Sequence, residues 1–361
     1  MRRNHRRQKV LGYAKKRFNC DTIAAFTPEN IYYLTGFWGE GVVVYNADLK
    51  TTLIVPRLEK ERALSASRDC DIVSAERGSN LISHFISTIG NSKTCIDCTD
   101  YSVVQTICRR LKSPRILRSS NDPFFRSRMI KEDEEISAIG RTAAILNKLY
   151  KICTEEIREG ISERTLQADL ICEALKMGAS PPSYRWTLDP LIIASGPRGA
   201  LPHADVSDRK FESGDMIIVD LTLRHEAYVA DCTRTFGLGS VTSYMSKVYD
   251  IVRESQILGL NAVSRGITCE DIDNRCREAI NRAGFKEFFI HSAGHGIGLD
   301  VHEPPWLRSK NTQKLENNMS ITIEPGIYLP GRFGVRIEDS IIVGAERQNL
   351  CEFTKELVII G

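Results

Sequence analysis

Residues 215–236 read DMIIVDLTLRHEAYVADCTRTF, and this stretch decides the fold of the second part of the chain. The apolar runs Asp215–Leu223 and Glu226–Phe236 are typical of two strands that pair as a hairpin. Asp220 and Asp231 interrupt these runs. A carboxylate among Met, Ile and Val side chains is costly unless it is paired or binds a metal, so both aspartates are candidate site residues.

A second block of sequence repeats this arrangement. The runs Ser320–Tyr328 and Gly334–Val343 predict another hairpin, and Glu324 and Glu338 lie in it in the same apolar context. The second part of the chain is therefore predicted to contain two similar halves, each with one acidic hairpin. The helices predicted around the hairpins are 136–157, a segment capped by Ser162 that runs to Gly178, 245–260 and 270–283.

The spacing of the acids is weak evidence by itself. The chain has 46 acidic residues in 361 positions, so two acids 11 positions apart occur by chance about five times. Arg234 and Arg336 lie close to these acids in the sequence. Simple ion pairing with the two arginines therefore stays open as the alternative to metal binding.

The first part of the chain alternates short apolar runs with helical patterns, which predicts an α/β domain. The cluster Ser119-Ser-Asn-Asp-Pro123 breaks this pattern, so the sequence predicts two domains, 1–123 and 124–361. The expected strands are 21–26, 41–45, 51–55, 70–74, 94–98 and 115–117, and the expected helices are 58–65, 81–89 and 103–111.

Composition excludes several classes of protein. A 42% apolar content, 26% charged residues and a net charge of +3 describe an ordinary globular chain and provide no large basic surface for nucleic acid. The basic cluster between Arg2 and Lys9 is interpreted as a solvated first helix, with a nucleic-acid or lipid contact as the alternative. No apolar run is long enough for a signal peptide or a membrane span, so a cytoplasmic protein without a membrane partner is expected.

Eleven cysteines are scattered along the chain, and several fall in apolar-periodic segments. Free thiols in a reducing compartment are the simplest interpretation. Cys95 and Cys98 form a Cys-x-x-Cys pair without a second pair at zinc-ribbon spacing, so two buried thiols are favoured over a redox or metal site.

Histidines strengthen the metal hypothesis. Five of the seven lie between His203 and His302, and His295 has glycine on both sides, which allows other backbone to approach it closely. Four carboxylates and one imidazole form an oxygen-rich donor set. Such a set suits two divalent first-row ions, such as Mn²⁺, better than a thiolate zinc site.

Motifs in the second part of the chain resemble the metal-dependent Xaa-Pro peptidases, the group of proline dipeptidase (prolidase) and aminopeptidase P. The resemblance extends from Ile136 to the C-terminus, and Tyr32-Tyr-Leu-Thr-Gly-Phe37 fits the N-terminal domain of that family more loosely. The motifs are Ile193-Ala-Ser-Gly196 with Leu201-Pro-His203, Asp220 with Asp231-Cys-Thr-Arg-Thr235, Gly294-His-Gly-Ile-Gly-Leu299 with Val301-His-Glu303, Ile323-Glu-Pro-Gly-Ile-Tyr328, and Gly334-Val-Arg-Ile-Glu-Asp339.

The resemblance implies a fold and a set of site residues. The fold is an α/β N-terminal domain followed by an α+β pita-bread domain, whose two pseudo-symmetric halves surround a dinuclear metal site. Two divalent ions are implied, with Mn²⁺ favoured over Co²⁺, Zn²⁺ or Fe²⁺. The implied roles are a first-metal ligand at Asp220, bridging ligands at Asp231 and Glu338, second-metal ligands at His295 and Glu324, and substrate contacts at His203 and His302. Thr222, Ala227 and Ala230 depart from the usual residues of the family without removing a ligand.

The implied activity is hydrolysis of the bond between an N-terminal residue and proline, with Glu324 as the base. Xaa-Pro dipeptides are the expected substrates, and longer peptides with proline second, as for aminopeptidase P, are the alternative. Methionine aminopeptidase is disfavoured by the N-terminal domain, and creatinase by the retained ligands. A non-catalytic pita-bread binding module is the alternative of another class. A homodimer is implied as well.

A dipeptidase must recognise the free carboxylate of proline, and arginine matches a carboxylate with two parallel hydrogen bonds. In archaeal-type prolidases that arginine tends to follow the His-Glu-x-Pro motif, where this chain has Trp306. Arg308 is therefore the expected carboxylate anchor, with a surface-loop role as the alternative. Arg336 is the other arginine among the substrate-binding candidates, and support of the metal site is favoured for it.

Overall fold

The computed structural model describes residues 2–111, 113–183 and 191–361. They form two compact units, Met1–Arg128 and Met129–Gly361. The division falls between Arg128 and Met129, in the last turn of helix α6 (Asp122–Met129), whereas the sequence places a boundary after residue 123. Pro123 lies in the first turn of this helix, where a missing N–H costs nothing, so it starts a helix instead of a linker.

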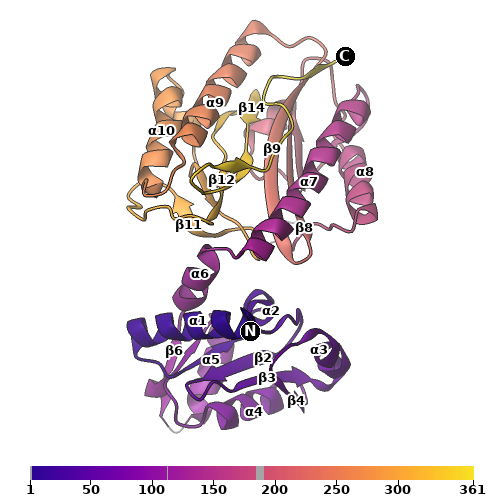
Figure 1. Cartoon of the computed structure of the whole chain (residues 1–361). Coiled ribbons are helices and arrows are strands. Elements are labelled where there is room, and N and C mark those ends of the chain that lie inside the picture. The colour runs from indigo at the N-terminus through magenta and orange to yellow at the C-terminus, as the bar shows by residue number, and fades with distance from the viewer. Residues whose placement is uncertain (1, 112, 184–190) are drawn as a thin grey trace. The chain divides into compact units, whose positions relative to one another are not determined.

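The first unit is a mixed six-stranded sheet with helices, as its alternating pattern predicts (Figure 1). Leu81 and Phe85 of one helix and Ile107 of another pack into the apolar core of this unit. The strands, in sheet order, are β4 (Asp71–Ala75), β3 (Thr51–Pro56), β2 (Val42–Asn46), β1 (Thr22–Ala25), β5 (Thr94–Ile96) and β6 (Leu117–Ser119). The other helices are α1 (Arg2–Phe18), α2 (Pro28–Thr35), α3 (Lys60–Ala66), α4 (Ser79–Ile89) and α5 (Tyr101–Arg110).

The N-terminal basic cluster forms the predicted helix but is only partly solvated. Arg6 and Arg7 are buried. The Arg7 guanidinium donates to the carbonyl oxygens of Leu34, Arg68 and Asp69. Because Leu34 lies in the last turn of α2, Arg7 satisfies a carbonyl that lacks a partner within the helix. These arginines therefore stabilise the first unit.

The first half of the second unit contains the predicted hairpin. Strands β8 (Met216–His225) and β9 (Tyr228–Leu238) pair antiparallel around the two-residue turn Glu226-Ala227. Both turn residues have positive φ, 49° and 72°, as a type I′ turn requires. The strands β7 (Leu191–Ser195) and β17 (Ile359–Ile360) complete this sheet, and the helices α7 (Asp133–Glu156) and α8 (Glu163–Lys176) pack against it (Figure 1).

The register of this hairpin puts both aspartates on one face. Asp220 pairs with Thr233, and Asp231 pairs with Thr222. Because residues two apart on a strand share a face, all four side chains point to the same side of the sheet. With a two-residue turn, two residues that are 11 positions apart, one on each strand, have their side chains on the same face of the sheet.

The second half differs from its prediction, because its hairpin is divided. The outer strands β12 (Ser320–Ile323) and β15 (Asp339–Ile342) pair in one sheet, and the inner strands β13 (Gly326–Leu329) and β14 (Phe333–Arg336) pair in another. Glu324 and Glu338 lie in the breaks between these strands and not within them as expected. Pro325 cannot donate to a ladder, which favours the break beside Glu324.

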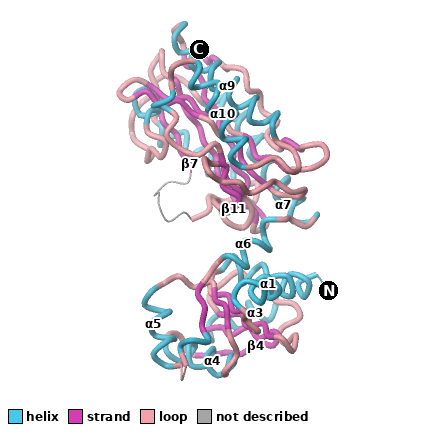
Figure 2. The backbone as a smooth tube through the Cα atoms, turned by 90° about the vertical axis from the view of Figure 1, so that its left-hand side faces the viewer, coloured by secondary structure: helices cyan, strands magenta, loops and turns pink. Residues whose placement is uncertain are grey.

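Helices α9 (Ser243–Ala262) and α10 (Cys269–Arg282) confirm the two helices predicted between the hairpins. They pack against each other and against strands of the second half (Figure 2). The remaining strands are β10 (Gly294–Gly296), β11 (Glu303–Leu307) and β16 (Gln348–Asn349). Across the described parts of the chain, none of the helices has both the length and the apolar character that a membrane crossing requires.

Candidate metal centre and active site

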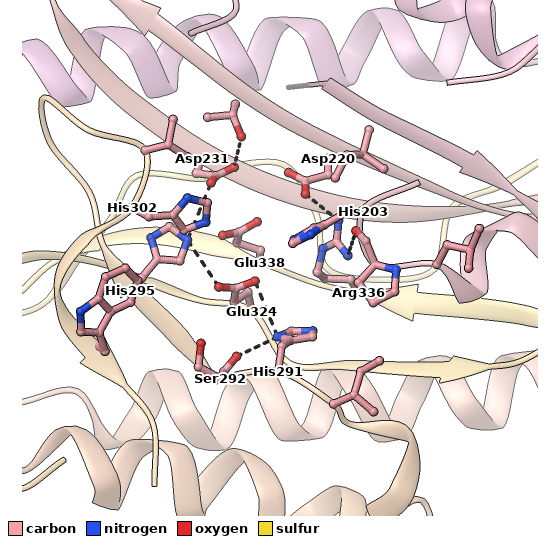
Figure 3. A pocket seen from close by; sticks show the side chains of 17 residues that line it. His203, Asp220, Asp231, His291, Ser292, His295, His302, Glu324, Arg336 and Glu338 are labelled. Atoms are coloured by element: carbon pink, nitrogen blue, oxygen red, sulfur yellow. Dashed lines mark hydrogen bonds and ion pairs between the residues drawn. The ribbon is translucent and has the colours of Figure 1, made fainter. Parts of the chain in front are cut away.

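A cavity of about 580 Å³ opens between the two halves of the second unit (Figure 3). It brings together every site residue predicted from the sequence except Arg308. The lining residues are Ile192, Leu201, Pro202, His203, Asp220, Thr222, Asp231, Ile290, His291, Ser292, His295, Val301, His302, Trp306, Glu324, Arg336 and Glu338.

Asp231 and Glu338 each have one carboxylate oxygen fixed by a threonine. The Thr222 hydroxyl donates to Asp231 Oδ1 over 2.8 Å, and the Thr233 hydroxyl donates to Glu338 Oε2 over 2.8 Å. Glu338 Oε1 is buried without a hydrogen-bond partner. A buried oxygen in this state is expensive, so it points to a cation that the protein is built to accept.

Asp220 also has one carboxylate oxygen fixed by a hydrogen bond, but here the donor is a charged arginine. The Arg336 guanidinium donates to Asp220 Oδ2 over 2.5 Å and to the Tyr328 hydroxyl over 2.8 Å. Asp220 Oδ1 is buried without a hydrogen-bond partner. Ion pairing, the alternative reading of the acids, therefore holds for one oxygen of Asp220 only, and Arg234 pairs with Asp339 instead.

His295 faces the carboxylates with its Nε2 atom. This nitrogen is 3.4 Å from Glu324 Oε1 and 4.0 Å from Asp231 Oδ2. The ring Nδ1 lies 3.0 Å from the Gly296 carbonyl oxygen, which can only accept, so Nδ1 carries the proton and Nε2 offers a lone pair. A Cβ on Gly296 would lie 2.6 Å from the Glu303 carbonyl oxygen, so the glycine is required for this close approach.

Burial and mutual repulsion change the protonation of these groups. Burial raises the pKa of Glu324 to about 8, with the Asp220 carboxylate adding to the shift. Burial, reinforced by neighbouring carboxylates, also raises the pKa values of Asp231 and Glu338. Burial lowers the pKa of His295, so its imidazole is neutral at pH 7.

The donor set fits divalent cations. Asp231, His295 and Glu338 each offer a ligand atom, and these atoms lie within 4.8 Å of one another. Asp220 adds its unpartnered oxygen, and Glu324 lies beside His295. Oxygen-rich sites with one imidazole suit Mn²⁺ and similar ions, and two cations would remove the repulsion among the carboxylates.

Three residues of the site were not assigned a role from the sequence. His291 Nε2 lies 2.8 Å from the Tyr328 hydroxyl, and burial lowers the pKa of His291 to about 3. Tyr328 links this histidine to Arg336. Thr222, which departs from the usual residue of the family, fixes one oxygen of Asp231. The register of the predicted hairpin places Thr222 opposite Asp231, so the contact between them could have been predicted from the sequence.

The remaining predicted residues flank the carboxylates. In the view of Figure 3, His302 and His203 lie on opposite sides of Glu338. The His302 ring centroid is 4.2 Å from that of His295, and Trp306 stacks on His302 at 6.5 Å with a 15° interplanar angle. Burial lowers the pKa of His302 to about 4, so its ring is neutral at pH 7.

Arg308 lies apart from the other predicted site residues. It was expected to anchor a substrate carboxylate, but its side chain is exposed and does not line the cavity. The Arg308 N–H donates to the Trp306 carbonyl oxygen, which closes a tight turn directly after β11. Trp306 lines the cavity, and the chain turns away before Arg308.

A second cluster with metal-ligating atoms, Cys232, Asp339 and Cys351, lies behind the cavity. In this cluster the positive charges come from side chains, because Arg234 and Lys355 both form ion pairs with Asp339 at 2.8 Å. The cluster is therefore an internal ion-pair network. The thiols of Cys95 and Cys98 are structural too, since burial raises both pKa values, that of Cys95 to about 12.

Two similar halves with acidic hairpins and a shared donor set between them define the pita-bread class of metal-dependent hydrolases. The chain belongs to metallopeptidase family M24, whose model matches residues 137–345, and residues 6–130 match the creatinase/prolidase N-terminal domain. Membership implies divalent metal ions. Both the family expected from the motifs and the expected fold class are confirmed.

Relatives align over nearly the whole chain. An Xaa-Pro dipeptidase from Pyrococcus furiosus is 35% identical over 334 residues, which are 91% of this chain and 92% of that protein. The structure of an Xaa-Pro dipeptidase from Bacillus anthracis superposes with a TM-score of 0.91 at 30% identity and covers 99% of this chain and 100% of that one. An X-Pro aminopeptidase from Thermotoga maritima has a TM-score of 0.86 at 28% identity, with 98% and 99% covered.

Metal binding to the metal-free protein is expected to release protons. With a pKa of about 8, the Glu324 carboxyl is about nine-tenths protonated at pH 7 and must ionise to become a ligand. Calorimetric titration with Mn²⁺ in two buffers of different ionisation enthalpy measures the number of protons.

The Glu324→Gln variant is the control and should release about one proton fewer. An apparent enthalpy that is the same in both buffers for the wild type would contradict the prediction.

Proposed function

We propose that the chain is a metal-dependent peptidase that hydrolyses the bond between an N-terminal residue and proline, with Xaa-Pro dipeptides as substrates and two Mn²⁺ ions as cofactors. Hydrolase and metallopeptidase character follow from the family. The dipeptide preference is supported by relatives named Xaa-Pro dipeptidase that align over almost the full chain.

One observation carries the proposal, namely the unpartnered oxygens of Asp220 and Glu338 beside His295, Asp231 and Glu324. We propose that Asp220 binds the first ion, that Asp231 and Glu338 bridge both ions, and that His295 and Glu324 bind the second. A non-catalytic binding module would not need these five donors around one cavity. Their retention therefore favours an enzyme.

The bound ions would supply a water molecule acidified toward neutral pH and would polarise the scissile carbonyl. Glu324 would act as the base that accepts a proton from that water, because its carboxylate faces the cavity beside His295. The proton then passes to the proline nitrogen, which has no N–H of its own before cleavage.

The histidines would act on the substrate. An imidazole ring carries at least one N–H donor in either protonation state, so His203 and His302 can each donate toward the developing oxyanion or hold the substrate. Arg336 is already used, since it donates to Asp220, Tyr328 and Thr233. We therefore assign Arg336 to the support of the metal site and not to a substrate carboxylate.

Removal of metal or of a bridging carboxylate is expected to abolish hydrolysis of Ala-Pro. Without the Asp231 charge two dications would repel each other across a short gap. The Asp231→Asn variant should lose at least about a hundredfold in kcat/KM, and chelator-treated wild type should be inactive until Mn²⁺ is restored.

The matched control is Asp208→Asn, because the Asp208 side chain is 83% exposed and lies outside the cavity. Wild-type rates from the chelated enzyme or from the Asp231→Asn variant would refute the metal mechanism. Inactivity of the metal-loaded wild type on every Xaa-Pro peptide would refute the proposed function.

Loss of Arg308 is expected to leave substrate preference unchanged. Because its side chain is exposed outside the cavity, the Arg308→Ala variant should keep the ratio of kcat/KM for Ala-Pro to that for its C-terminal amide within about twofold. Ala-Pro-Ala is the third substrate to compare. If the variant loses activity on Ala-Pro alone, Arg308 is the anchor after all.

The same comparison decides between the two kinds of Xaa-Pro peptidase. Wild-type cleavage of Ala-Pro-Ala without cleavage of Ala-Pro would identify an aminopeptidase P, which is the alternative activity. The similar structure from Thermotoga maritima is named an X-Pro aminopeptidase.

We also propose a homodimer in the cytoplasm. Eleven free thiols support a reducing compartment. The dimer rests on the resemblance to the family alone. Sedimentation equilibrium should give about twice the chain mass of 40.6 kDa at micromolar concentration. A single 40.6 kDa species would contradict the dimer.

A further inference from the structure

A buried ion pair lies behind the histidines of the cavity. Lys131 Nζ is 2.8 Å from Glu303 Oε1, and the two side chains are 1% and 2% exposed. Lys131 lies between α6 and α7, and Glu303 is the first residue of β11. Neither residue lines the cavity, but Glu303 directly follows His302, which does.

The ion pair also supports the loop that joins His295 to His302. A Cβ on Gly298, within this loop, would lie 2.6 Å from Glu303 Oε1 and 3.2 Å from Lys131 Cε. The backbone of the loop therefore rests directly on the charged groups. On its other side the Gly298 carbonyl oxygen accepts from the Val229 N–H at 2.8 Å, which ties the loop to β9.

The strand pairing next to the ion pair is irregular. His295 pairs with Trp306 and Gly296 pairs with Glu303, so the register shifts between these two positions. Such bulges redirect side chains, and their geometry depends on what fixes the strand on each side. Glu303, the residue directly after His302, is fixed by its ion pair with Lys131.

A buried ion pair is a poor device for stability alone. Taking two charges out of water costs about as much as their attraction returns, and apolar residues of similar volume often replace such pairs without loss. What the pair supplies is a defined geometry, since the ammonium and the carboxylate must meet at hydrogen-bond distance.

We propose that Lys131 and Glu303 are positioning residues that hold His302 in its catalytic orientation. The inference rests on the proposed function, because it assigns His302 a contact with the substrate. The Lys131–Glu303 contact fixes the start of β11 and the Gly298 loop together, so the His302 ring is held against His295 at a centroid distance of 4.2 Å. Loss of the pair frees the His302 ring without removing any metal ligand.

The test separates positioning from stability with a double variant. Lys131→Met leaves the Glu303 charge without its ammonium partner and should lower kcat for Ala-Pro at least about tenfold, with KM within about threefold. Lys131→Met with Glu303→Met removes both charges at similar volume. This double variant should melt near the wild-type temperature yet keep the low kcat. A double variant with wild-type kcat would overturn the proposal.

Asp97→Asn is the matched control for a buried carboxyl group outside the second unit. Asp97 is fully buried and accepts hydrogen bonds from Phe26, Thr27 and Asn30. This variant should lower the melting temperature while kcat stays at the wild-type value. A parallel loss of kcat in the control would show that the assay reports stability and would remove the support for positioning.

A second measurement does not depend on activity. Imidazole NMR signals of the metal-free protein, assigned with His302→Gln, should shift for His302 in the double variant and stay unchanged in Asp97→Asn. Unchanged His302 signals in the double variant would overturn the inference even if kcat falls. If the wild type hydrolyses no Xaa-Pro peptide, the proposed function fails, and the NMR comparison alone decides whether the pair positions His302.

Discussion

Repulsion among carboxylates confined in one cavity is the constraint on which the second unit depends. Asp220, Asp231, Glu324 and Glu338 face a common space, and burial raises the pKa of Glu324 to about 8. Hydroxyl donors from threonines and the Arg336 guanidinium each hold one oxygen and leave others open. A protein that fixes one oxygen of a buried carboxylate and leaves the other without a partner, as at Asp220 and Glu338, is organised to receive cations.

The strand registers create this confinement. On β8 and β9 the type I′ turn sets a register in which the two aspartates share a face with the threonines opposite them. In the second half the divided hairpin keeps one register across its break, since Ile323 pairs with Asp339 and Gly326 pairs with Arg336. Glu324 and Glu338 therefore lie opposite each other where the ladder opens. The bridge between Thr233 and Glu338 joins the two halves.

The sequence predicted much of this arrangement and missed parts of it for physical reasons. Apolar runs with two acids identify the first hairpin, because burial and strand alternation are local properties. Local patterns do not show where a ladder opens, so Glu324 and Glu338 were expected within strands. Arg308 was expected as the anchor from the chemistry of arginine and carboxylate, but local sequence does not show where the chain turns after β11, which here depends on one backbone hydrogen bond. The burial of Arg7 depends on carbonyls from α2 and from residues 68 and 69, which are distant in sequence.

The turn at Glu226-Ala227 has a consequence for how the length of the chain can vary. Strand side chains alternate with a period of two, so one residue inserted here would turn the whole of β9 over and point Asp231 out of the cavity. The length of the loop between β13 and β14, where Gly331 has φ 71°, is limited in the same way, because a change of length would move Glu324 and Glu338 out of register. These two surface turns therefore tolerate changes of residue type more readily than changes of length. Insertions that loops normally accept would have to fall elsewhere in this domain.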